Sequence, residues 1–189
     1  MRMDAVRKAI QRYVELSDKE WAEMHGCWSE RTFPKGAIIT ATGQVERFFS
    51  IVKEGVQRIY FEHDGNEACI GFAYGGSWCG VFDSFVSQSP SRFVLQAMSP
   101  SVLFSIDHAD LQELYRRIPK MERFGRSMLE EVVVARATRE VEQLTMTAQE
   151  RYDRLVGRSP HLLQLVPQKD IASYLGMSPE TFSRLRAKR

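Results

Sequence analysis

The chain has 189 residues, of which 43% are apolar and 26% are charged, and its net charge at pH 7 is +2. This length favours one domain of about 120 residues together with a smaller one. No apolar run approaches the roughly 20 residues that cross a bilayer, and the opening MRMDAVRKAIQR carries no apolar signal segment. We therefore expect a cytoplasmic protein with no membrane partner.

The cysteines and histidines lack the clustering that metal sites and disulfide frameworks need. The three cysteines are odd in number and show no CxxC spacing, and the four histidines stand singly. They are Cys27, Cys69, Cys79, His25, His63, His108 and His161. These patterns argue against a cupin-like metalloenzyme and a redox or haem sensor, so we expect no metal and no catalytic activity. Buried packing is expected for the cysteines, with a lone reactive thiol as the alternative for Cys79.

Helical patterns occupy the first thirty residues. Ser17 precedes Glu20 at the spacing of a capping box, and apolar residues from Leu16 to Trp28 recur at helical intervals. Between Phe33 and Asp107 the pattern changes to short β-rich runs separated by glycine. The region should therefore be a β domain that follows an N-terminal helical segment.

The β-rich runs AIIT, RFFSIVKEG, VQRIYFEH, EACIGFAYGG, SRFVLQA and SVLFSID predict antiparallel strands. Asp64-Gly65, between the third and fourth runs, suits a tight type I′ turn, so these two runs should form a hairpin. Roughly six to eight such strands are typical of a β-sandwich or small barrel, with a jelly roll as the closed form.

Helical periodicity returns after Asp107, which is a suitable N-cap for HADLQELYRRI. Pro119 can begin a longer helix, interrupted as far as Leu144 only by Gly125. Its middle, MLEEVVVARA, is apolar around more of its circumference than a one-sided surface helix needs. It can pack on the barrel and on the same helix of a second subunit, or be buried within one chain.

The C-terminal residues predict a helix-turn-helix. A Thr147-x-x-Glu150 capping box begins a helix that precedes the pair. Pro167 begins the first helix of the pair, and Gly176 forms the turn before the second. Gly176 can take the positive φ that the turn demands, while Phe182 and Leu185 would face inward.

The outer face of the last helix would then be free to enter a DNA major groove. Arg184 can donate two hydrogen bonds to a guanine, and Glu180 can accept one from a cytosine amino group. The following cations can hold phosphates. The candidate DNA-binding residues are Lys169, Ser178, Pro179, Glu180, Thr181, Ser183, Arg184, Lys188 and Arg189.

The charge distribution supports this reading. Residues 151–189 carry eight basic and three acidic side chains, a net charge of +5, whereas the other 150 residues sum to −3. A basic segment on a slightly acidic body is the pattern expected when one end meets a polyanion. A merely solvated basic terminus is the alternative.

The order of these parts resembles the CRP/FNR superfamily of bacterial transcription regulators, over nearly the whole chain. The resemblance rests on FPKGAIITATGQVERFFSIVKEGVQRIYFEHDGNE, on GGSWCG as the entry to a phosphate-binding cassette, and on DIASYLGMSPETFSRL as the recognition unit. It implies an α+β fold: a double-stranded β-helix (jelly-roll), cyclic nucleotide-binding-like barrel over residues 1–117, a central dimerisation helix over 118–145, and a helix-turn-helix over 146–189.

The resemblance also implies a function and partners. We expect a homodimer, joined through the central helix, that binds near-palindromic double-stranded DNA as a sequence-specific transcription regulator, with RNA polymerase as a further candidate partner. The family's recognition helix is followed by a β wing, whereas this sequence ends at Arg189. A helix-turn-helix without a full downstream wing is therefore expected, with DNA affinity that depends more on Lys188 and Arg189.

The cassette departs from the pattern of members that bind cyclic AMP. In those members a glutamate after the second glycine binds the ribose hydroxyl, and an arginine-serine pair binds the phosphate. Here Val81 follows Gly80, and the closest match to the pair is Ser91-Arg92, in reversed order. An unpaired ribose hydroxyl would cost about 1–3 kcal/mol, so we expect no micromolar binding of cyclic AMP.

The candidate pocket residues by this resemblance are Gly80, Val81, Phe82, Ser91, Arg92 and, on the central helix, Arg136. An unpaired Arg136 would suit an anionic ligand, and an ion pair with Glu140 at i+4 is the alternative. No cofactor is certain, and an unidentified small anionic effector is the candidate. The alternative function is a cyclic-nucleotide-binding signalling module that acts through a protein partner rather than through DNA.

Overall fold

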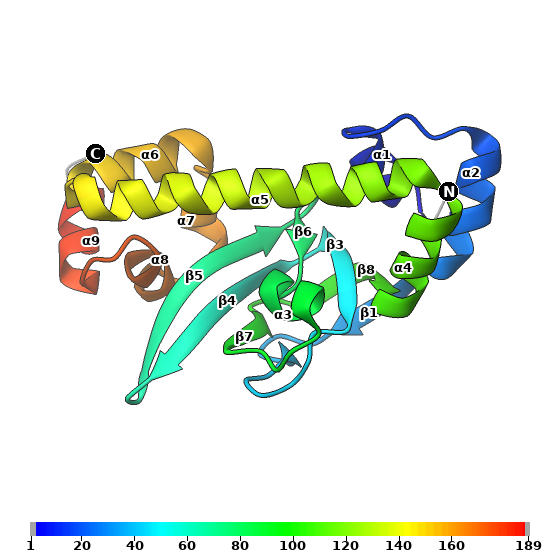
Figure 1. The fold of residues 1–189 in the computed structure, drawn as a ribbon. Helices are drawn as coiled ribbons and strands as arrows, with labels where there is room; N and C mark the ends of the chain where they lie inside the picture. The colour runs from blue at the N-terminus through cyan, green and yellow to red at the C-terminus, as the bar shows by residue number, and fades with distance from the viewer. Residues whose placement is uncertain (1–2, 188–189) are drawn as a thin grey trace. The chain divides into compact units, whose positions relative to one another are not determined.

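The computed structural model describes residues 3–187 (Figure 1). Its fold is α+β, with antiparallel strands after two N-terminal helices and with helices again from residue 108 onward, as predicted. Within the described residues, no helix is long and apolar enough to cross a membrane.

The N-terminal helices are α1 (Asp4–Gln11) and α2 (Asp18–Met24), followed by the 3₁₀ helix η1 (His25–Cys27). The predicted capping box is present: the Ser17 hydroxyl accepts from the Glu20 N–H at 3.3 Å, and the Ser17 N–H donates to the Glu20 carboxylate at 2.8 Å. The helical segment ends earlier than predicted, because a strand already begins at Ser29.

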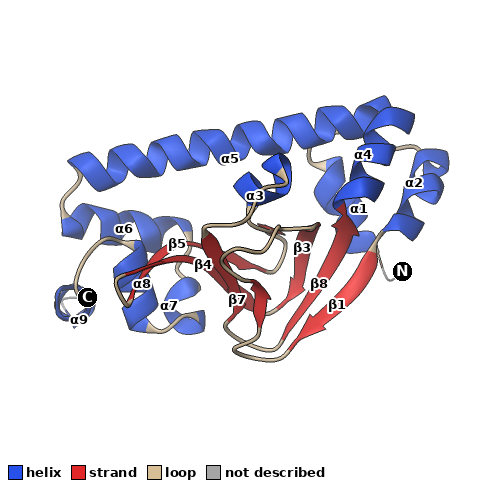
Figure 2. Ribbon diagram, turned by 60° about the horizontal axis from the view of Figure 1, so that its bottom comes forward, coloured by secondary structure: helices blue, strands red, loops and turns tan. Residues whose placement is uncertain are grey.

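Within residues 3–187, eight strands form two four-stranded sheets, with orders β1-β8-β3-β6 and β2-β7-β4-β5. Figure 2 labels β1, β8 and β3 of the first sheet and β7, β4 and β5 of the second. Adjacent strands such as β1 and β8 are far apart in the sequence, which confirms the predicted jelly-roll type of sandwich. The strands are β1 (Ser29–Phe33), β2 (Ile38–Thr40), β3 (Phe48–Glu54), β4 (Val56–His63), β5 (Asn66–Tyr74), β6 (Trp78–Cys79), β7 (Phe93–Ala97) and β8 (Ser101–Asp107). β1 and β6 were not among the predicted runs.

The turn between β4 and β5 has the predicted geometry. Asp64 and Gly65 have φ values of 48° and 74°, and a type I′ turn requires positive φ at both central residues.

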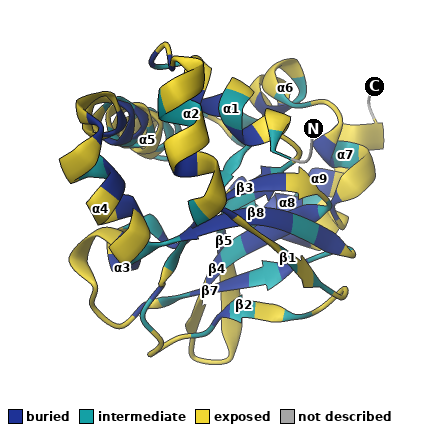
Figure 3. Ribbon diagram, turned by 90° about the vertical axis from the view of Figure 1, so that its right-hand side faces the viewer, coloured by how far each residue is buried: buried dark blue, intermediate teal, exposed yellow. Residues whose placement is uncertain are grey.

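The core of the barrel lies between the sheets. Buried side chains of Val52, Leu95, Leu103 and Cys79 form one cluster there. β8 is buried along nearly its whole length and β3 from Phe49 to Val52 (dark blue in Figure 3). Both faces of β3 are covered, because Phe49 packs outward against aromatic rings while Val52 points into the cluster.

α4 (His108–Arg117) begins at the predicted N-cap, where the Asp107 carboxylate accepts from the Ala109 N–H at 2.9 Å. The predicted long helix is α5 (Pro119–Thr145). All of its buried residues, from Met121 to Met128, lie in its first ten residues, whereas Val133 and Leu144 are 65% and 79% exposed.

A helix that was not predicted, α3 (Phe82–Ser87), follows β6 directly. Its signal was weak, since Phe82, Phe85 and Val86 give only one turn of helical spacing. It ends at Gln88, which has a φ of 50°.

The C-terminal helices are α6 (Ala148–Arg158), α7 (Leu162–Leu165), α8 (Gln168–Tyr174) and α9 (Pro179–Ala187). The Thr147–Glu150 capping box is present, α7 was not predicted, and α8 and α9 form the predicted helix-turn-helix. Gly176 in the turn has a φ of 64°, and a Cβ there would lie 2.5 Å from the Gln143 side-chain oxygen. Only glycine therefore fits this position without strain.

Packing divides the chain into two units. The first extends to Ile59 and resumes from Phe72 to Glu131, and the second takes Tyr60–Gly71 and continues from Val132. The tip of the β4–β5 hairpin thus packs with the C-terminal helices: the Cys69 N–H donates to the Ser173 hydroxyl of α8 at 2.9 Å. The domain boundaries at 118 and 146 stay a prediction.

Candidate functional site

The segment that resembles a phosphate cassette is built around a tight bend. Gly80 is buried with a φ of 154°, and a Cβ there would lie 3.3 Å from the Phe48 carbonyl oxygen. The bend brings Val81 to the start of α3, where its backbone N–H has no partner inside the helix. In a phosphate-binding site, such an N–H group would donate a hydrogen bond to the phosphate.

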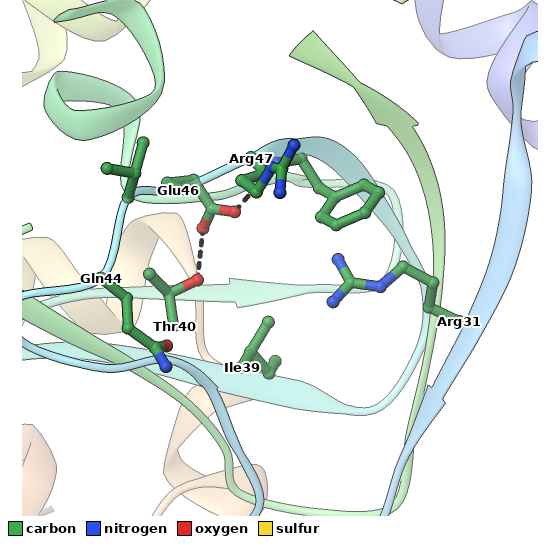
Figure 4. A pocket seen from close by; sticks show the side chains of 8 residues that line it. Arg31, Ile39, Thr40, Gln44, Glu46 and Arg47 are labelled. Atoms are coloured by element: carbon green, nitrogen blue, oxygen red, sulfur yellow. Dashed lines mark hydrogen bonds between the residues drawn. The ribbon is translucent and has the colours of Figure 1, made fainter. Parts of the chain in front are cut away.

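Here that N–H is already bound by the protein's own carboxylate. Glu46, only 3% exposed, accepts from the Val81 N–H at 3.3 Å and from the Thr40 hydroxyl at 2.7 Å through one oxygen, and from the Phe48 N–H at 3.1 Å through the other. The Glu46 N–H in turn donates to the Ser84 hydroxyl in α3 at 3.0 Å. Strands β2 and β3 and the cassette are thus joined around the buried Glu46 carboxylate, whose hydrogen bond from Thr40 is drawn in Figure 4.

Sequence reasoning missed Glu46. Its only signal was a single acidic residue two positions before the apolar run FFSIV, and its partners are up to 38 residues away. No local spacing rule connects such positions.

The structure brings three of the predicted pocket residues together at the start of α3. Gly80 and Val81 are buried, and the Val81 side chain belongs to the core cluster. Phe82 is half-buried and lines a separate apolar cavity of about 110 Å³ with Phe49 and Phe85. The three form part of the barrel wall, and their role toward a ligand stays a prediction.

The other predicted pocket residues lie in different surroundings. The buried Ser91 hydroxyl donates to the Phe93 carbonyl at 2.7 Å, so its hydrogen-bonding capacity is used locally. The Arg92 side chain is 76% exposed and lies 3.7 Å from the Asp83 carboxylate. Arg136 is exposed on the part of α5 that belongs to the second unit, and within residues 3–187 no ion pair joins it to Glu140.

An open pocket of about 380 Å³ lies beside Glu46, between β1, β2 and the chain that leads into β3 (Figure 4). Arg31, on β1, points into it with its guanidinium 3.9 Å from the centroid of the Phe48 ring. Partial burial lowers the pKa of Arg31, and the neighbouring Glu46 carboxylate opposes that shift. The remaining lining residues are Ile39, Thr40, Gln44, Val45 and Arg47.

The cysteines and acidic residues form no candidate metal centre. Among the described residues there is no group of three or more His, Cys, Asp or Glu side chains that could hold a metal ion. Burial raises the pKa of the Cys79 thiol far above its ordinary value, and the Glu46 carboxylate adds to this effect. Cys79 therefore stays protonated at neutral pH, which favours packing over the reactive-thiol alternative.

The predicted recognition residues do share an exposed surface on α9 and the turn before it. Ser178, Pro179, Glu180, Ser183 and Arg184 are exposed, and Thr181 is half-buried. Lys169 is exposed on α8. Lys188 and Arg189 lie outside the described residues.

Local hydrogen bonds order the start of α9. The Ser178 hydroxyl accepts from the Thr181 N–H at 3.2 Å, and the Arg184 guanidinium donates to the Thr181 hydroxyl at 3.3 Å. Hydrogen bonds from the Glu180 backbone N–H and from the Ser178 side chain lower the pKa of the Glu180 carboxyl. Glu180 is thus ionised at neutral pH and can act only as an acceptor.

The helix-turn-helix is held from inside by aromatic packing and from one side by an arginine. Phe182 is fully buried, with its ring centroid 5.6 Å from that of Tyr152 in α6. Arg151, also in α6, donates to the Leu175 carbonyl at 2.7 Å, to the Met146 carbonyl at 2.6 Å and to the Gly176 carbonyl at 3.3 Å. These bonds fix the turn against α6.

Some of the basic side chains in the C-terminal segment bind other groups of the protein. Arg151 binds backbone carbonyls, and Arg154 and Arg158 both pair with the Glu142 carboxylate, at 2.9 and 2.5 Å. Three of the eight basic side chains of residues 151–189 are therefore bound to other groups of the protein. The cations of α8 and α9 remain as candidates for contact with a polyanion.

Part of the chain matches a known protein domain. Residues 30–118 match the family model of the cyclic nucleotide-binding domain. No curated protein matches the chain.

Solved structures of regulators resemble the whole fold. FixK2 from Bradyrhizobium japonicum is 18% identical, with a TM-score of 0.73 over 85% of this chain and 83% of that chain. The catabolite activator protein of Thermus thermophilus is 20% identical, with a TM-score of 0.61 over 95% and 85%. CLP of Xanthomonas campestris, a c-di-GMP-responsive global regulator, is 17% identical, with a TM-score of 0.67 over 91% of each chain. Residues 30–118 thus match the cyclic nucleotide-binding domain model, and the chain shares the fold of these solved structures.

Proposed function

We propose that the protein is a dimeric, sequence-specific DNA-binding transcription regulator whose barrel does not bind cyclic AMP. The observation that carries the proposal is the exposed start of α9. Polar and charged side chains from Ser178 to Arg184 stand together there, on a helix anchored by the buried Phe182. The likeness to solved regulators supports the same function.

DNA reading would use the first two turns of α9. Arg184 can donate a bidentate pair of hydrogen bonds to guanine, and the ionised Glu180 can accept from a cytosine amino group. Lys169, on the neighbouring helix, is placed to contact phosphates, with Lys188 and Arg189 as further candidates.

Dimerisation would use the second half of α5. Val134, Ala137, Val141 and Leu144 follow one another at intervals of three, four and three residues, and all four are exposed. This spacing is that of the a and d positions of a coiled coil. Because 57–79% of the Val141, Val134 and Leu144 surfaces is exposed, the same face of a second copy is the partner that fits.

The barrel lacks the groups that a cyclic nucleotide would need. Val81 cannot accept a hydrogen bond from a ribose hydroxyl, and its backbone N–H already donates to Glu46. A cyclic phosphate would have to displace a buried carboxylate that holds three hydrogen bonds. Titration of the protein with cyclic AMP in a calorimeter should accordingly give no low-micromolar dissociation constant.

Selection of bound DNA from a random pool tests the main proposal. The selected sites should share a two-fold symmetric motif with half-site centres about one helical turn apart. Arg184→Ala should relax the preference at one position of each half-site, whereas Lys169→Ala should weaken all sites alike. Enrichment of no motif at low salt would contradict the proposal, and a protein that binds no DNA but binds a cyclic nucleotide would favour a signalling module acting through a protein partner.

A further inference from the structure

We propose that the pocket beside Glu46 binds a small organic monocarboxylate, whose carboxylate is held by Arg31. This inference concerns the barrel alone. It goes beyond DNA binding and does not depend on it, because every residue involved belongs to the first packing unit.

The guanidinium of Arg31 is contacted by aromatic rings and makes no hydrogen bond to the described residues. Its guanidinium lies 3.9 Å from the Phe48 ring centroid and 5.0 Å from that of Phe33, so aromatic rings contact it. Within residues 3–187 it donates no hydrogen bond and forms no ion pair. A half-buried arginine with five unused donors, pointing into a pocket, offers a fork that matches a carboxylate (Figure 4).

Within the described residues Glu46 makes no hydrogen bond to Arg31, although its carboxylate interacts with the guanidinium electrostatically. Both Glu46 oxygens already accept hydrogen bonds, from Thr40, Val81 and Phe48. The carboxylate thus belongs to the scaffold of the barrel, and the donors of Arg31 are left for a molecule from outside.

Glu46 also limits the charge that the ligand can carry. Its carboxylate lines the pocket together with the positively charged side chains of Arg31 and Arg47. A single carboxylate balances what remains, whereas a dianion such as a phosphate monoester would meet repulsion from Glu46 at short range.

The rest of the pocket suits a compact and mainly apolar body. Ile39, Val45 and Phe48 supply apolar walls, and the side-chain amide of Gln44 has an N–H₂ group that donates to no described residue. The volume of about 380 Å³ lies near the lower end of the range of small-molecule pockets. A ligand with one carboxylate on a small apolar skeleton uses all of these features.

The probe that tests this is 4-fluorobenzoate, observed by fluorine NMR, with neutral 4-fluorobenzamide as its matched control. Added protein should shift or broaden the fluorine signal of the carboxylate in a saturable way and leave the amide unchanged. Arg31→Gln should weaken binding about tenfold to a hundredfold, since a charge-assisted pair is lost. Arg116→Gln, which removes an exposed cation outside the pocket, should leave the affinity unchanged.

Two measurements guard against misfolding of the variant. Arg31→Lys keeps the charge but loses the fork, so its affinity should fall between those of the parent and Arg31→Gln. In the unaltered protein, the backbone amide signals of Val45 and Phe48 should move on titration with 4-fluorobenzoate. Equal binding of the benzamide, unchanged binding by a folded Arg31→Gln protein, or no binding of the benzoate would each overturn the proposal. Displacement by inorganic phosphate at lower concentration than by benzoate would overturn the monocarboxylate class.

Discussion

The cassette and the recognition helix use charge in opposite ways. In the barrel, the Glu46 carboxylate is buried and three donors of the protein satisfy it. On α9, by contrast, Glu180 and Arg184 are exposed, and their hydrogen bonds are local, to the same helix and its cap. The buried Glu46 carboxylate holds parts of the barrel together, whereas the exposed Glu180 carboxylate is accessible for contact with a partner molecule. The proposed DNA-reading role of α9 is therefore compatible with its exposed charges, whereas the occupied Val81 N–H argues against nucleotide binding at the cassette.

The largest effect is expected where the recognition helix is anchored. Phe182→Ala removes a fully buried ring that packs on Tyr152, and should lower the free energy of unfolding by about 3–5 kcal/mol. Urea unfolding followed by circular dichroism measures this. Leu165→Ala, at a side chain that is 49% exposed, should cost less than about 1 kcal/mol. Similar losses for both would mean that α9 is not held by its inner face.

The buried carboxylate of the cassette should give the next largest effect. Glu46→Gln turns one acceptor into a donor that faces an N–H or O–H group, and should destabilise the protein by about 1–3 kcal/mol. Chemical denaturation against Glu30→Gln provides the comparison. Glu30 is an exposed carboxylate 3.4 Å from Lys53, and its loss should cost no more than about 1 kcal/mol. A stable Glu46→Gln protein would remove the contrast between the two regions.

The arginine that fixes the turn should have a smaller effect. Arg151→Lys cannot reach three carbonyl groups at once, and should lower stability by about 1–2 kcal/mol, with weaker DNA binding. Arg154→Lys keeps a surface ion pair with Glu142 and should change stability by less than about 0.5 kcal/mol. Thermal unfolding of the two variants side by side makes the comparison, and equal melting temperatures would contradict the scaffold role of Arg151.

The smallest effect concerns pH and the cap of α2. Hydrogen bonds from the Ser17 backbone and side chain, then from Lys120, lower the pKa of Glu20 to about 2. Because the folded pKa lies below the ordinary value of 4.5, the cap stabilises the fold fully above pH 4.5 and loses this contribution as the pH falls toward 2. Thermal melting from pH 6 to pH 2 should show the parent falling toward Glu20→Gln, and curves that stay parallel would contradict this.

Several local features were predictable from sequence because their hydrogen bonds span only a few residues. The capping boxes at Ser17 and Thr147, the N-cap Asp107 and the Asp64-Gly65 turn all formed where the local pattern placed them. Other local elements were missed. α3 is too short for a periodic signal, and β1 follows helices in a stretch with little β character.

By itself, the sequence indicated most of the elements, the jelly-roll type of β domain and the helix-turn-helix, because cap, turn and periodicity rules operate within about one turn of chain. The elements α3, α7, β1 and β6 were the exceptions. Only the tertiary structure decided what the charges do. Glu46 meets Val81 across 35 residues, Arg151 meets Leu175 across 24, and Arg31 lies against Phe48 from another strand. Such pairs are set by packing of distant segments, so no local pattern distinguishes a scaffold charge from one that is free to bind a ligand or DNA.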